Sequence, residues 1–221
     1  METFPKIITV KDQEQGLNYA RNILYRKSDN QTLLFLSGGS TPKVLYQTLA
    51  QEKRLRGKAV GMIDEREDRS NFEMIKNTGL LTYFKNTKIS FYPIISSSIY
   101  NKKIRNLIKS PGNKIAIMGI GEDGHTAGLP AKSPSFAGTS KDKQGYVEVF
   151  SGFSGKLKER ISMTFKALSE MDLLIILAFG SAKQNALGLM FRKGSEEEIP
   201  SRFYLRPDIA SKTILITDQE I

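Results

Sequence analysis

The segment Thr32-Leu33-Leu34-Phe35-Leu36-Ser37-Gly38-Gly39-Ser40-Thr41-Pro42 joins an apolar run directly to a turn of glycine and hydroxyl residues. Its first part, 32–36, lacks the alternation of a strand with one exposed face, so we interpret it as a strand buried on both faces. A helix is predicted straight after the turn, over 43–52. A buried strand that leads at once into a helix is typical of α/β proteins with a parallel sheet.

The same succession of buried strands and amphipathic helices continues along the chain. We therefore predict an α/β fold in which a mainly parallel sheet is covered by helices on both faces, as a single domain over residues 1–221. The predicted strands are 6–10, 32–36, 60–64, 88–92, 115–118, 146–150, 173–178 and 213–216, and the predicted helices are 12–27, 43–52, 71–81, 99–108 and 182–191.

The composition is that of an ordinary globular chain with a strong positive charge. Of the 221 residues, 39% are hydrophobic and 25% are charged, and the formal net charge is +10. Such a field attracts anions, but the basic residues are scattered, which favours a solvated basic surface over a nucleic-acid module. No apolar run is long enough to span a membrane, and no secretion signal is visible. We expect a cytoplasmic protein, a monomer or weak homo-oligomer, that binds neither nucleic acid nor membranes.

Cysteine is absent and histidine occurs once. The first fact excludes disulfides and thiolate chemistry, and together they argue against a zinc site, because zinc prefers nitrogen and sulfur ligands. The one histidine, His125, lies just after Asp123 in the loop 119–126, which follows a predicted strand. Imidazole exchanges protons near neutral pH, so His125 is a candidate acid or base. A lone histidine is more often a plain surface or core residue, and that alternative stays open.

The run 119–124 also matches Gly-x-Gly-x-x-Gly, a pattern of dinucleotide-binding turns. Such a turn opens a continuous helix, whereas Gly128 and Pro130 interrupt any helix here. We therefore interpret the loop as one that displays Asp123 and His125.

The turn 37–42 has the chemistry of a phosphate cradle. Ligands of open α/β sheets bind beyond the carboxyl ends of the strands, where this turn lies. Its glycine amides, the hydroxyls of Ser40 and Thr41 and the coming helix N-terminus all suit an anion. The same residues also make an ordinary capped turn, and the two interpretations are equally supported. The spacing of a Walker A loop is missing.

Charged residues follow three further predicted strands. Asp64 and Arg66 come at the end of 60–64, where on charge alone a solvated run is the simpler interpretation. Arg160 and Lys183 are each unremarkable as surface residues, although arginine suits forked recognition of phosphate and lysine a point contact.

Taken together, these segments resemble the 6-phosphogluconolactonase family, in the wider group that includes glucosamine-6-phosphate deaminase. The resemblance covers most of the chain, from about 12 to 218. Its markers are Ser37-Gly38-Gly39-Ser40-Thr41-Pro42, Asp64-Glu65-Arg66 with Ser70-Asn71, Gly119-Ile120-Gly121-Glu122-Asp123-Gly124-His125-Thr126-Ala127, Arg160-Ile161-Ser162-Met163-Thr164, Gly180-Ser181-Ala182-Lys183 and Ile199-Pro200-Ser201.

The resemblance implies a modified doubly wound, Rossmann-like sheet that needs no metal or organic cofactor. It implies hydrolysis of a phosphorylated sugar lactone, 6-phospho-D-glucono-1,5-lactone, to 6-phosphogluconate in the oxidative pentose phosphate pathway. The residues that would hold the sugar phosphate are Gly38, Gly39, Ser40, Thr41, Arg160 and Lys183. The residues that would act at the lactone end are His125 as the general base, Arg66, Asp64 and Asp123.

Two alternatives to the lactonase remain. The chain departs from the family pattern in the short Glu67-Asp68-Arg69 link and in Ala127-Gly128-Leu129-Pro130, which leaves the substrate preference open. An aminosugar deaminase of the same fold needs a further acid after the histidine, yet 124–130 contains no glutamate, and Arg66 stands where deaminases commonly have an aromatic residue. A non-catalytic phosphosugar-binding protein is the other alternative. Either Asp64 or Asp123 could orient the imidazole.

Overall fold

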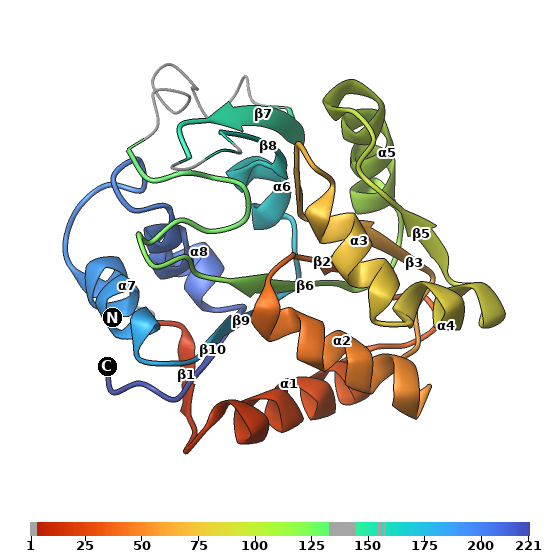
Figure 1. Cartoon of the computed structure of the whole chain (residues 1–221), viewed down its shortest axis with the longest axis horizontal. Helices are drawn as coiled ribbons and strands as arrows, with labels where there is room; N and C mark the ends of the chain where they lie inside the picture. Colours follow the sequence, from red (N-terminus) through yellow and green to blue (C-terminus); the bar gives the residue numbers. More distant parts are fainter. Residues whose placement is uncertain (1–3, 133–144, 154–155, 157) are drawn as a thin grey trace.

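The computed structural model describes residues 4–132, 145–153, 156 and 158–221. Within these residues, seven strands form one sheet in which every neighbouring pair is parallel (Figure 1). In spatial order the strands are β1 (Lys6–Thr9), β10 (Thr213–Thr217), β9 (Leu173–Ala178), β6 (Lys114–Gly119), β2 (Leu33–Leu36), β3 (Ala59–Met62) and β5 (Ser90–Tyr92).

Helices cover both faces of this sheet, as predicted. Figure 1 shows α1, α2 and α4 on one side and α5, α6 and α8 on the other. All four residues of β2 are buried, since strands packed between two helical layers have no exposed face. The helices are α1 (Gln13–Lys27), α2 (Ser40–Glu52), α3 (Ser70–Asn77), α4 (Leu80–Asn86), α5 (Ser97–Lys109), α6 (Phe165–Ser169), α7 (Ala182–Phe191) and α8 (Pro207–Ala210), with a 3₁₀ helix η2 (Pro200–Leu205).

The chain order along the sheet creates a crevice between β2 and β6. From β2 the chain proceeds to β3 and β5 on one side, whereas from β6 it proceeds to β9 and β10 on the other. The loops that leave β2 and β6 therefore diverge at neighbouring strand ends, which is where doubly wound sheets bind ligands. The amide of Ser37 still donates to the carbonyl of Ile117 at 3.1 Å, so the two loops start side by side.

A second, antiparallel sheet departs from the sequence prediction. The predicted strand 60–64 ends at Met62, and Asp64 begins a strand that pairs outside the main sheet. The predicted strand 146–150 belongs to this second sheet, and the charged segment around Arg160 proves to be a strand. The second sheet, in spatial order, consists of β4 (Asp64–Arg66), β8 (Glu159–Met163) and β7 (Val147–Ser151).

Helix bounds also differ from the prediction, most clearly at two places. The predicted helix 71–81 is broken after Asn77, because Gly79 adopts a φ of +83° that ends one helix and starts the next. Helix α2 begins at Ser40 instead of residue 43, so Ser40 and Thr41 belong to its first turn.

Candidate active site

A cavity of about 650 Å³ opens at the crevice between β2 and β6. It collects loop residues from the main sheet and strand residues from the small sheet. Every residue that the sequence marked as a candidate lies in its lining: Gly38, Gly39, Ser40, Thr41, Asp64, Arg66, Asp123, His125, Arg160 and Lys183.

One wall of the cavity is the N-terminus of α2. Gly39 has a φ of +109°, a conformation that favours glycine, and it turns the chain from β2 into the helix. A methyl group on Gly38 would lie 1.9 Å from Oδ1 of Asn71, so only glycine lets α3 pack this closely. The free amides and partial positive charge of the helix start therefore face the cavity together with Lys183, from the start of α7.

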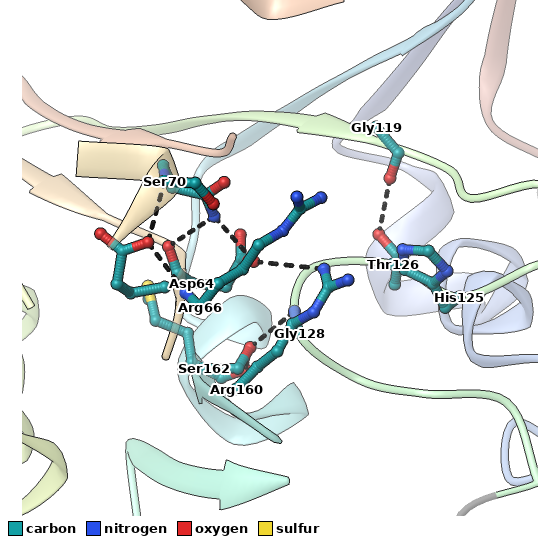
Figure 2. A network of polar contacts seen from close by, with 12 residues as sticks. Asp64, Arg66, Ser70, Gly119, His125, Thr126, Gly128, Arg160 and Ser162 are labelled. Carbon is teal, nitrogen blue, oxygen red and sulfur yellow. Dashed lines mark hydrogen bonds and ion pairs between the residues drawn. The ribbon is translucent and has the colours of Figure 1, made fainter. Parts of the chain in front are cut away.

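A second wall is the tight loop that carries His125. Its ends are held by bonds from the amide of Gly121 to the carbonyl of His125 (2.8 Å) and from the Thr126 hydroxyl to the carbonyl of Gly119 (3.0 Å; Figure 2). The amide of Ser201 donates to the carbonyl of Gly124 at 3.0 Å and fixes the loop from outside. The described residues that follow the loop, 127–132, form no helix, which agrees with the interpretation that the loop displays Asp123 and His125.

Asp123 is the carboxylate that contacts the imidazole. Its Oδ1 lies 2.5 Å from Nδ1 of His125 and also accepts the His125 amide at 3.1 Å. The hydrogen bond from the imidazole lowers the pKa of Asp123 to about 2, so this carboxylate stays ionised at neutral pH. An ionised acceptor at Nδ1 favours the tautomer whose proton is on Nδ1, which leaves Nε2 as the basic nitrogen.

The third wall carries two arginines in direct register. Arg66 of β4 is paired with Arg160 of β8, and Figure 2 shows both side chains extending beside Asp64, with His125 on its own loop. Like charges on facing strand positions repel each other. The Nε atoms of Arg66 and Arg160 are both buried without a hydrogen-bond partner among the described residues. Buried donors in this state are rare, and guanidinium N–H groups suit anionic acceptors.

Asp64 partly balances the two arginines. It is only 3% exposed, and its Oδ2 lies 3.8 Å from Nη1 of Arg160 and accepts a hydrogen bond from Asn71 at 3.1 Å. Burial raises the pKa of Asp64 above its usual range, although Arg160, His125 and Arg66 oppose that rise.

Replacing Asp64 by asparagine should therefore raise Tm at pH 7 by a few degrees. A carboxyl whose folded-state pKa is raised stabilises the fold below its unfolded-state pKa of about 3.9 and loses that contribution as the pH rises through the folded value. Asparagine stays neutral and can still accept from Asn71. Thermal denaturation of both proteins at pH 7 and at about pH 3 checks this: the Tm difference should disappear in acid. A lower Tm for the variant at pH 7 would show that the pairing with Arg160 outweighs burial.

Two residues near this wall, Glu65 and Phe153, could not be assigned correctly from the sequence. The Asp64-Glu65-Arg66 run is not a solvated charge run, because Glu65 is buried and accepts the amides of Arg66, Asn71 and Phe72 at the start of α3. Phe153 lines the cavity and was not singled out. In the sequence, Phe153 is distinguished only as a single aromatic residue in a polar link that contains glycine.

Within the described residues, no three His, Asp or Glu side chains are grouped closely enough to hold a metal ion. In the same part of the chain, no helix combines the length and apolar character that crossing a membrane requires.

The fold and the cavity together define an α/β protein with a pocket at the switch point of its sheet that is lined by Arg66, Arg160 and Lys183. A family model described as glucosamine-6-phosphate isomerases/6-phosphogluconolactonase matches residues 16–214. The chain therefore belongs to this family, as the sequence markers indicated.

The relatives that match this chain include both lactonases and deaminases. The chain is 28% identical over 205 residues to a 6-phosphogluconolactonase of Xylella fastidiosa, covering 81% of this chain and 84% of that one. It is 24% identical over 220 residues to a glucosamine-6-phosphate deaminase of Lactobacillus acidophilus, covering 92% of each. The structure of a 6-phosphogluconolactonase from Plasmodium vivax superposes with a TM-score of 0.75 at 20% identity, over 97% of this chain and 91% of that one. The last similarity confirms the fold.

Proposed function

We propose that this chain is a 6-phosphogluconolactonase, which hydrolyses 6-phospho-D-glucono-1,5-lactone to 6-phosphogluconate. The observation that carries the proposal is the single cavity that gathers an oriented imidazole, two arginines with unpartnered Nε atoms and a helix N-terminus. Such a cavity offers one base for water and several cations for a phosphorylated, carbonyl-bearing ligand.

His125 acts as the general base in this proposal. Its Nε2 removes a proton from a water molecule while the water oxygen bonds to the lactone carbonyl carbon. Asp123 holds the ring by Nδ1 and stabilises the imidazolium that forms, at the 2.5 Å contact described above.

Arg66 stabilises the oxyanion that the carbonyl oxygen becomes, since its guanidinium lines the cavity beside Asp64. The tetrahedral intermediate then breaks the bond between the carbonyl carbon and the ring oxygen. The imidazolium of His125 returns its proton to that oxygen, and the new carboxylic acid ionises in solution. Atoms and charges balance with water as the only co-reactant.

Lys183, Arg160 and the start of α2 hold the phosphate in this proposal. Replacing Lys183 by alanine should raise KM by about 10- to 100-fold with kcat within about threefold, because one charge-assisted contact is lost in ground state and transition state alike. Steady-state kinetics with the lactone measures both constants. Lys102→Ala, which removes an exposed cation of α5, is the matched control and should leave KM unchanged. An unchanged KM in Lys183→Ala would remove Lys183 from the phosphate site.

The deaminase is the alternative to test, because the family contains both activities and relatives of both kinds match this chain. The absence of a glutamate in 124–130 and the presence of Arg66 favour the lactonase. Release of ammonia from glucosamine 6-phosphate by the wild-type protein would reverse the assignment.

A further inference from the structure

Phe153 lines the cavity from the link that joins β7 to β8. Gly152, with a φ of +109°, turns the chain after β7, and the amide of Phe153 donates to the carbonyl of Lys158 at 3.4 Å. These backbone features direct a large apolar ring into a charged cavity, where it is 8% exposed.

The ring of Phe153 contacts two of the proposed functional side chains at once. The guanidinium carbon of Arg160 lies 3.9 Å from the ring centroid, a close cation–π arrangement. The imidazole of His125 meets the same ring edge-on, with centroids 5.4 Å apart and planes at 90°. One aromatic side chain thus packs against both the proposed base and a proposed phosphate ligand.

The stack of Arg160 on Phe153 is accompanied by a long contact between Arg160 and Asp64. A charge-assisted hydrogen bond between guanidinium and carboxylate is about 2.7–2.9 Å long, whereas the Arg160–Asp64 distance is 3.8 Å. The Nε of Arg160 also has no hydrogen-bond partner in the part of the chain that the structure describes. The guanidinium lies over the ring, and its planar group carries N–H donors around its edge that suit a ligand.

We propose that Phe153 is a positioning residue that holds Arg160 away from Asp64 and ready for the phosphate of the substrate. The proposal rests on the proposed function for the identity of the substrate. The stack acts through Arg160, so its loss should weaken phosphosugar binding more than it slows the chemical step.

The test compares variants that keep or remove the π face. Phe153→Leu keeps an apolar side chain without a π face, Phe153→Met is a second version if the leucine variant does not fold, and Phe153→Tyr keeps the face. Calorimetric titration with 6-phosphogluconate and with inorganic phosphate gives Kd without turnover, and lactone kinetics gives KM and kcat. Tyr92→Leu removes a ring that lies 4.5 Å from Nζ of Lys103, outside the cavity lining, and serves as the control.

We expect Phe153→Leu to raise Kd and KM by about 3- to 30-fold with kcat within about threefold, and Phe153→Tyr to stay within about twofold of wild type. In an Arg160→Ala background, Phe153→Leu should change Kd no further. A folded Phe153→Leu or Phe153→Met variant with wild-type Kd, or an equal loss in the Arg160→Ala background, would overturn the proposal. If the wild-type protein binds phosphate but does not accelerate lactone hydrolysis, the proposed function is wrong. The comparison of Kd values for inorganic phosphate between the variants would still decide the role of Phe153.

Discussion

His125→Ala is expected to lower kcat by about 10²- to 10⁴-fold while the Kd for 6-phosphogluconate stays near the wild-type value. The imidazole is the proposed proton acceptor from water, and alanine offers no replacement. The phosphate ligands proposed here lie on α2, α7 and β8, so binding should survive the change. Single-turnover kinetics and calorimetric titration separate the two effects.

The size of this loss depends on the imidazole being fixed in place. The His125 loop is closed by backbone bonds and by Thr126, which is fully buried and contacts the Tyr204 hydroxyl at 2.5 Å. Removing the ring leaves these bonds intact, so the variant should keep its Tm within a few degrees. Near-wild-type turnover in a folded His125→Ala protein would contradict the proposed mechanism.

Arg66→Met should lower kcat by about 10²- to 10³-fold, the usual cost of losing one oxyanion donor. We expect that this half-buried charge can be removed without destabilising the fold. Its cross-strand neighbour is Arg160, so the substitution relieves a repulsion between like charges, and methionine retains much of the apolar stem. We therefore expect an unchanged or higher Tm together with the loss of turnover.

Arg66→Lys is the matched control for charge alone. It keeps the cation but loses the planar fork, so it should recover only part of the activity. A kcat for Arg66→Met within about threefold of wild type would assign oxyanion stabilisation to another group of the cavity.

The main sheet could be predicted because its strands are buried on both faces. Three neighbouring central strands form from the apolar runs 32–36, 115–118 and 173–178. Short uninterrupted apolar runs are typical of strands that are buried on both faces. The loops after these strands could then be placed at one edge of the sheet. This placement brings the turn 38–41, Asp123, His125 and Lys183 to one cavity, whereas Asp64, Arg66 and Arg160 reach it from the small sheet.

The small antiparallel sheet could be predicted only in part: the run 146–150 is an expected strand, but β4 and β8 are rich in charged residues. β8 begins Glu159-Arg160, of which Glu159 is exposed and Arg160 lines the cavity, so the period of a half-buried strand is hidden. The same difficulty concealed Glu65, whose burial is possible only because three backbone amides satisfy its carboxylate. Tertiary pairing, not local sequence, decides both cases.

Only the structure shows which carboxylate contacts the imidazole of His125. Asp64 and Asp123 both lie near His125, and sequence alone gives each of them the same chemistry. The structure separates them by environment: Asp123 hydrogen-bonds the ring, whereas Asp64 is buried beside Arg160 and Asn71. Two carboxylates with opposite pKa shifts around one histidine can then serve different purposes.

One measurement tests the central claim most directly: the wild-type protein is incubated in parallel with fresh 6-phospho-D-glucono-1,5-lactone and with glucosamine 6-phosphate. The lactone hydrolyses spontaneously, so its consumption is compared with that in buffer and with His125→Ala. The account predicts lactone consumption well above both, with no ammonia released from the aminosugar. Ammonia release without faster lactone consumption, or a lactone rate equal to that of His125→Ala, would contradict it.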